Sequence, residues 1–248
     1  MSRIFATYLG GTLAVLIIWQ AAIVIISPQC FMLPAPLNVM EAAIERHEFL
    51  LHHAAITLVE IVLGLAFGTL AGAATALAVT SLPGMRQTVW PVILVLQALP
   101  VFAIAPVLVL WFGFGLTSKV VMASLIIFFP VASAFADGLR RTQPSVVSAA
   151  RILGAGDWQI LRFIRIPLAL PGLITGLRVA APLAPLGAVI GEWVGASGGL
   201  GFIMLQANAR MQSDTLFAAL FILAALSLAL RSLVDELAPR MAPWAQES

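Results

Sequence analysis

The sequence predicts an all-α, polytopic membrane protein, and two observations lead to this fold class. Of its 248 residues, 61% are apolar and only 10% are charged, and the mean hydropathy is +1.05. Long stretches carry no charge at all, whereas a bilayer span needs about 20 apolar residues. A soluble domain of this length would need far more charge on its surface, so we expect about six transmembrane helices.

The charge-free stretches place these helices along the chain. Residues 4–40, 61–85 and 87–118 contain no charged side chain, and shorter apolar runs follow. The first run is too long for a secretion signal and lacks a small-x-small exit, which favours an uncleaved first span. The expected spans lie near 8–27, 54–80, 89–113, 118–138, 171–191 and 214–233.

The distribution of basic residues predicts the orientation. With the N-terminus inside, the outer side holds only Arg46, Lys119 and Arg210. Positive charge concentrates on the cytoplasmic side of membrane proteins, so we expect both termini in the cytoplasm. The residues expected inside, or just within the fifth span, are Arg3, Arg86, Arg140, Arg141, Arg151, Arg162, Arg165, Arg178, Arg231 and Arg240.

Between the first two spans, a proline-rich segment is followed by a short polar helix. Asn38 is expected to cap this helix, which covers Met40–Leu51 and lies along the outer surface. The second span carries Gly64, Gly68 and Gly72 at four-residue spacing. Small residues on one stripe allow another helix to approach closely. We favour packing inside one subunit over a dimer seam.

Prolines interrupt three of the later spans. Pro100 and Pro106 free backbone carbonyls in the third span, and such breaks are tolerated at membrane depth beside a cavity or in a protein interior. A translocation path and an inert kinked bundle are both compatible with them. Glu60 and Glu192 lie near membrane depth, where a carboxylate is costly, so each is expected at an interface, in a cavity or beside a partner. The candidate path-lining residues are Gln97, Pro100, Phe102, Pro106, Phe128, Phe129, Glu60 and Glu192.

No catalytic or metal-binding constellation is recognisable in the sequence. His47, His52 and His53 lie close together, but adjacent histidines diverge on a helix, so interfacial side chains are expected rather than a metal site. No serine or cysteine has the setting of a nucleophile. We therefore expect a non-enzymatic chain that does not itself hydrolyse a nucleotide.

An amphipathic segment between the fourth and fifth spans is the most informative part of the chain. Pro144 suits the first turn of a helix that ends at Leu153, and Gly154 can end it as a left-handed cap. Asp157 is then expected to cap a second helix, Trp158–Ile166, with Trp158, Leu161 and Ile164 on one side. This predicts a cytoplasmic elbow that offers an apolar surface to a partner. The alternative is a helix pair lying on anionic lipid.

At this elbow the sequence resembles the permeases of binding-protein-dependent ABC importers. Their cytoplasmic loop reads Glu-Ala-Ala, three residues, Gly, nine residues, Ile-x-Leu-Pro. Ser148 stands where the glutamate is usual and Ile166 where the leucine is, which leaves a charged contact in doubt. The residues that the resemblance assigns to ATPase docking are Ser148, Ala149, Ala150, Arg151, Gly154, Asp157, Ile164 and Pro167.

The resemblance covers nearly the whole chain and is closest to the nitrate/sulfonate/taurine branch. It implies one transmembrane permease domain over residues 1–248, with a docking loop at about 139–170. It also implies a bacterial inner-membrane homodimer, two ATP-binding subunits that carry ATP and Mg, and a solute-binding protein outside; no cofactor binds this chain. Gln97–Ala103 and Asp137–Thr142 are most similar to permeases for a thiamine pyrimidine precursor of the hydroxymethylpyrimidine type. A sulfonate, taurine or nitrate importer is the alternative, and a stand-alone secondary transporter is the alternative of another class.

Overall fold

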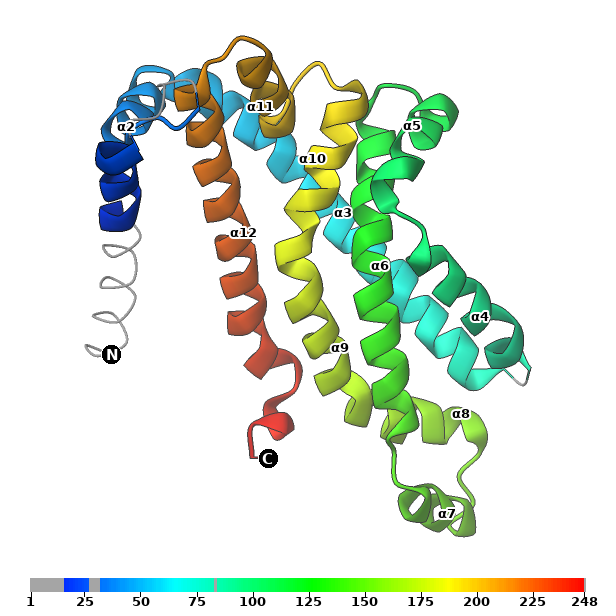
Figure 1. The fold of residues 1–248 in the computed structure, drawn as a ribbon. Coiled ribbons are helices and arrows are strands. Elements are labelled where there is room, and N and C mark those ends of the chain that lie inside the picture. Colours follow the sequence, from blue (N-terminus) through cyan, green and yellow to red (C-terminus); the bar gives the residue numbers. More distant parts are fainter. Residues whose placement is uncertain (1–15, 27–31, 83, 248) are drawn as a thin grey trace.

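The computed structural model describes residues 16–26, 32–82 and 84–247, and the regular structure in them is helical throughout (Figure 1). Residues 16–26 form a helical segment, Leu16–Ile26. The elements that follow are α2 (Pro36–Glu45), α3 (His47–Ser81), α4 (Met85–Ala98), α5 (Val101–Phe112), α6 (Leu116–Arg140), α7 (Pro144–Ile152), α8 (Asp157–Ile160), the π-helical η1 (Leu161–Arg165), α9 (Ile166–Ala180), the 3₁₀-helical η2 (Ala181–Leu183), α10 (Ala184–Gly195), α11 (Leu200–Ala209), α12 (Ser213–Met241) and η3 (Pro243–Glu247).

The long helices agree with the expected spans, with longer bounds. Four helices in the described residues are long and apolar enough to cross a membrane: α3, α6, α12 and the continuous helix Asp157–Gly195. The pair α4 and α5 makes a fifth span only if the two are counted together, because they meet at 101°. The expected first span, 8–27, lies partly outside the described residues. The all-α polytopic fold is confirmed, and six spans are compatible with it.

The glycine stripe on the second span packs inside the subunit, as expected. A Cβ atom at Gly68 would lie 2.7 Å from the Ser124 carbonyl oxygen and 2.8 Å from Ile127 Cβ, both on α6. Gly72 faces the same helix, and a Cβ atom there would lie 3.0 Å from the Phe128 carbonyl oxygen. Because lipid gives helices no hydrophobic reason to associate, this close backbone approach is what holds α3 on α6.

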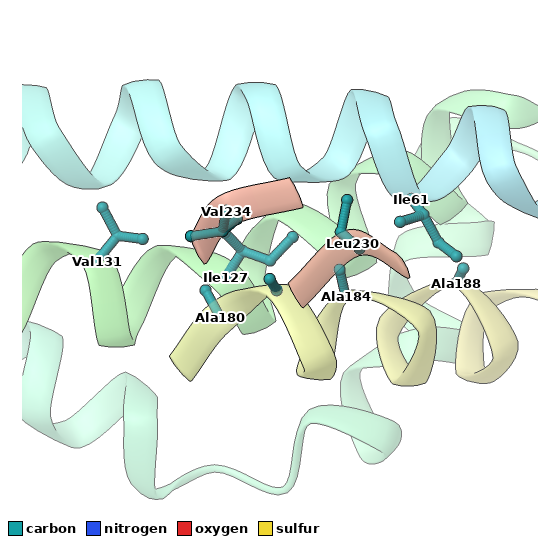
Figure 2. Packing of buried hydrophobic residues seen from close by; sticks show 9 residues of the cluster. Ile61, Ile127, Val131, Ala180, Ala184, Ala188, Leu230 and Val234 are labelled. Carbon is teal, nitrogen blue, oxygen red and sulfur yellow. The ribbon is translucent and has the colours of Figure 1, made fainter. Parts of the chain in front are cut away.

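The centre of the bundle is filled by small and branched apolar side chains. Figure 2 shows Ile61 of α3, Ile127 and Val131 of α6, and Leu230 and Val234 of α12 meeting one strip of alanines. Those alanines stand on α9, η2 and α10, and are Ala180, Ala181, Ala184 and Ala188. Their small size lets this interrupted helix pass close to three others.

Prolines break the chain at two of the expected places. Leu99 and Pro100 are extended, and the sharp bend between α4 and α5 falls on them. Pro182 lies in η2, where α9 gives way to α10. In contrast, α5 and α6 continue through Pro106 and Pro130. A proline alone therefore does not decide where these helices bend.

The ends of the helices correct two local predictions and add one element. Asn38 does not cap a helix: α2 begins at Pro36 with Ala35 as its N-cap, because proline is favoured in a first turn. The second span begins at His47, since the helix continues through the polar segment before residue 54. The short apolar helix α11 is not among the elements expected from the sequence. It lies with α2 and α5 at the end of the bundle opposite α7 and α8 (Figure 1).

Candidate functional site

The predicted elbow exists, and a glycine turn separates its two helices. Gly154 has φ of +86°, in the left-handed region expected for the residue that ends α7. The turn is closed by two backbone hydrogen bonds, from Ala155 N to Ala150 O at 3.0 Å and from Gly154 N to Arg151 O at 3.0 Å. The elbow therefore has a defined shape.

Asp157 acts differently from the sequence prediction. The N-cap of α8 is Gly156, whose N–H donates to Gln159 Oε1 at 2.8 Å. Asp157 is the first residue of α8, and its carboxylate accepts from Arg151 Nη2 at 2.9 Å. This exposed ion pair bridges the two helices of the elbow across Gly154. An exposed ion pair of this kind adds little stability.

The elbow exposes four large apolar side chains, which we call the apolar knob: Ile152, Leu153, Trp158 and Phe163. They are between 67% and 87% exposed. The predicted partner of Trp158, Leu161, is instead buried against Phe135 and Leu139 and ties the elbow to α6. Apolar surface of this size outside the bundle marks an interaction site.

The elbow is continuous with a transmembrane helix. α8, η1 and α9 follow one another without a break from Asp157 to Ala180. Pro167 lies in the first turn of α9, and the π-helical turn just before it accommodates its missing N–H. Ile164 and Pro167 are half-buried, whereas Ser148 and Ala149 are exposed and Ala150 is half-buried. A displacement of the elbow would thus pass directly into α9.

A groove runs between α6 and α9, and we call it the α6–α9 groove. Its deeper part is a cavity of about 520 Å³ that includes Gln97, Ser133 and Thr175. A second cavity of about 370 Å³ continues it towards Arg141. The two cavities share Ala134, Asp137 and Thr175. The lining is largely apolar, with a few hydroxyl and amide groups, Asp137 in both cavities and Arg141 in the second.

The candidate path-lining residues fall into three places. Gln97 and Phe129 line the α6–α9 groove. Pro100 forms the α4–α5 bend, and Phe102 and Pro106 are exposed on α5. Phe128 lines a separate apolar cavity between α3 and α6.

Glu60 and Glu192, the other two candidates, meet in a buried cluster. Glu192 is 1% exposed, and its carboxyl accepts from Thr57 Oγ1 at 2.6 Å, Gly201 N at 2.5 Å and Phe202 N at 3.3 Å. Glu60 is 0% exposed and pairs with Lys119 Nζ at 3.2 Å. The cluster joins α3, α6, α10 and the start of α11.

Two further side chains of α3 complete this cluster, which we call the polar cluster. His53 Nδ1 accepts from Gly199 N at 3.0 Å, and Thr57 Oγ1 accepts from Leu200 N at 2.8 Å. The first N–H groups of a helix have no partner in their own helix. The four N–H groups of residues 199–202 at the start of α11 are therefore all accepted by side chains of α3 and α10.

Sequence reasoning misses most of the polar cluster. The charge pattern places Lys119 on the outer surface, yet it is 6% exposed. His53 and Thr57 precede Glu60 by two helical turns and one, so one face of α3 carries all three. That spacing is a signal that the sequence does contain. The pairing with residues 192 and 199–202 lies far away in the sequence and could not be inferred from spacing.

Comparison with known proteins identifies the class of this helical bundle. Residues 64–243 match the family of binding-protein-dependent transport system inner membrane components, so the chain belongs to that family. It is 45% identical to a probable ABC transporter permease protein of Haemophilus influenzae, over 91% of this chain and 92% of that protein.

Two relatives with named solutes are equally similar. The chain is 33% identical to the formylaminopyrimidine transport permease protein of Halalkalibacterium halodurans, over 94% of this chain and 93% of that protein. It is also 33% identical to the taurine transport system permease protein of Escherichia coli, over 94% and 88%. The fold matches inward-facing MetNI methionine ABC transporter with a TM-score of 0.69 and 21% identity, over 79% of this chain and 98% of that one.

The protein is thus a non-catalytic, multi-pass inner-membrane permease subunit of an ABC importer. The ATPase of such a system is a separate subunit. This agrees with the expectation drawn from the sequence of the elbow. The stand-alone secondary transporter is therefore no longer an alternative.

Proposed function

We propose that this permease imports a small neutral heterocycle, a thiamine pyrimidine precursor of the hydroxymethylpyrimidine type, as a homodimer served by two ATPase subunits and an external binding protein. The elbow and its apolar knob support the proposed coupling of the permease to the ATPase. The lining of the α6–α9 groove supports the proposed substrate. Both termini and the elbow then face the cytoplasm, in agreement with the positive-inside distribution.

The apolar knob suits a groove on the ATPase. Truncating large apolar side chains at the centre of an interface is what typically costs the most binding energy. Ser148, Ala149 and Ala150 stand beside the knob with small side chains and allow close approach. We propose the docking loop 139–170 as the ATPase contact, with Arg151 and Asp157 setting the angle of the elbow.

The chemistry of the α6–α9 groove supports a neutral ring over an anion. Gln97, Ser133 and Thr175 can exchange hydrogen bonds with ring nitrogens and amino groups. Its one carboxylate at this depth, Asp137, is already paired with Arg140. A sulfonate would need a cation to offset its desolvation, and Arg141 lines only the second cavity and not the one that holds Gln97 and Ser133. A sulfonate or taurine importer remains the second candidate, because the taurine permease is equally similar.

Crosslinking tests the docking part. Single cysteines at Ala149 and Trp158, introduced after Cys30→Ser, should crosslink to the ATPase in membranes. Ile44→Cys on α2 is the matched control, since it is equally exposed but lies at the other end of the bundle. Crosslinks from Ile44 and none from the elbow would overturn the proposed docking loop.

Uptake tests the substrate part. In a strain that cannot make the pyrimidine, deletion of this gene should abolish rescue by low external hydroxymethylpyrimidine or a formylated aminopyrimidine. Growth on taurine or alkanesulfonates should be unchanged. The opposite pattern would refute the pyrimidine assignment and leave the importer assignment intact.

A further inference from the structure

A small polar cavity of about 320 Å³ lies beside the elbow, away from the α6–α9 groove. It is bounded by the last turns of α3 and α6 and by η1. Arg140, Arg165, Thr80 and Thr142 supply its polar wall, and Val79 and Leu139 part of its apolar wall. Its position next to η1 places it at the junction of the elbow and the membrane spans.

The two arginines differ in whether their charge is paired with an acidic side chain. Arg140 pairs with Asp137 and stacks on Trp90, with its guanidinium 5.6 Å from the ring centre. Arg165 forms no ion pair within the described residues, and its Nε is buried without a hydrogen-bond partner. A buried N–H without an acceptor is unfavourable. The wall of the cavity therefore holds one uncompensated cation and one unused donor.

The two threonines can add further hydrogen bonds. Thr80 Oγ1 donates to Ala76 O at 2.8 Å, and Thr142 Oγ1 donates to Leu139 O at 3.3 Å. Each hydroxyl can rotate away from its own helix and donate into the cavity instead. A guanidinium with hydroxyl donors beside it is the arrangement that recognises a phosphate.

We propose that this cavity binds a phosphate group, with Arg165 as its principal ligand and Thr142 and Thr80 as supporting donors. The proposal rests on the proposed function in one respect, that the elbow faces the cytoplasm. Two sources supply the same chemistry there: the phosphodiester of an anionic lipid, or a free phosphate ester. Basic pockets between transmembrane helices on this side are known as lipid headgroup sites.

A competing role for Arg165 follows from the same geometry. α3 and α6 both end at the cavity, and the carbonyl ends of helices favour a nearby cation. If Arg165 only offsets these carbonyls, its removal destabilises the protein equally in every lipid. If it binds the phosphate of an anionic lipid or of a free ester, removal cancels a stabilisation that these anions provide and that zwitterionic phosphatidylcholine, whose phosphate is neutralised by its choline, does not. The lipid dependence of stability separates the two roles.

The test uses the purified full-length protein in nanodiscs and measures its thermal unfolding midpoint. Wild type should be more stable in phosphatidylglycerol than in phosphatidylcholine, and Arg165→Gln should lose this difference. The matched control is Arg162→Gln, which removes an exposed charge of the same segment that stacks on Phe163. A second variant, Arg165→Lys, keeps the charge. It should need an at least tenfold higher phosphatidylglycerol content to reach half of the increase in the unfolding midpoint.

Titration of inorganic phosphate and glycerol 3-phosphate in phosphatidylcholine identifies the source. Stabilisation by these anions, absent in Arg165→Gln, would assign a soluble ester; stabilisation by phosphatidylglycerol alone would assign a lipid. An equal loss for Arg165→Gln in both lipids, or no effect of any phosphate on wild type, would overturn the proposal. Because no transport is measured, the result is independent of the docking and uptake tests.

Discussion

Replacing Glu192 tests whether the polar cluster holds α11 in place. In Glu192→Ala the N–H groups of Gly201 and Phe202 lose their acceptor while staying buried. Each unsatisfied buried donor costs about 1–3 kcal/mol, so two of them cost about 2–6 kcal/mol of unfolding free energy. Loss of side-chain packing adds to this value.

Glu192→Gln should behave differently, and this contrast makes the test specific. The amide oxygen can take the place of Oε2 and accept both N–H groups. The amide nitrogen can then donate to Thr57 Oγ1, whose own proton already has the His53 carbonyl oxygen at 3.2 Å as an acceptor. The backbone donors of residues 201 and 202 keep their acceptor and one amide N–H has Thr57 Oγ1, so we expect a smaller loss than in Glu192→Ala, about 1 kcal/mol.

Two measurements check this prediction. Denaturant unfolding of the purified protein gives the free energies, with Glu45→Ala on the exposed side of α2 as the control. Hydrogen exchange should become faster at the amides of residues 199–202 in Glu192→Ala only. Equal stability of the Ala and Gln variants, or unchanged exchange in both, would refute the assignment of Glu192 as the acceptor for α11.

Three further predictions concern single contacts. Lys119→Met leaves Glu60 buried without its partner and should cost about 3–5 kcal/mol, whereas the double variant with Glu60→Gln should recover most of it in the same denaturant assay. Gly68→Ala forces a Cβ against α6 and should cost about 1–3 kcal/mol, while Ala66→Leu, on the exposed side of α3, should be nearly neutral. Gly154→Val strains the left-handed turn by about 1–2 kcal/mol and should uncouple ATP hydrolysis from uptake, whereas Gly154→Asn, which tolerates that conformation, should transport; normal transport by the Val variant would contradict the coupling role.

Local sequence patterns predict the helices and the turn between α7 and α8. The spans follow from charge-free length, and Gly154 follows from the position of a glycine after an amphipathic helix. Helix bounds are less predictable, because α3 continues into residues expected in a separate surface helix, and α9 is continuous with the second helix of the elbow. α11 escapes prediction since its ten residues are too few for a span.

The polar cluster shows what a single sequence cannot supply. Glu60 and Glu192 are each costly in a bilayer, which correctly marks them as needing partners. Glu60 pairs with Lys119, and Glu192 accepts from Thr57 and from the backbone of Gly201 and Phe202, which four helices bring together. Only the packing of glycines on α3 against α6 decides that Lys119 meets Glu60 rather than the outer surface.

The two halves of the bundle are held together by different forces, and this bears on how the elbow could act. Hydrogen bonds and an ion pair tie α3, α6, α10 and α11 together at the end away from the elbow. Nearer the elbow, α9 meets α6 through small residues, with a Cβ at Gly176 only 2.9 Å from the Pro130 carbonyl oxygen. Smooth apolar contacts of this kind allow sliding, whereas directional hydrogen bonds resist it. Arg178 of α9 is also paired with Asp235 of α12 at 2.7 Å, so a push from the elbow is expected to move α9 and α12 together along α6, while the polar cluster holds α10.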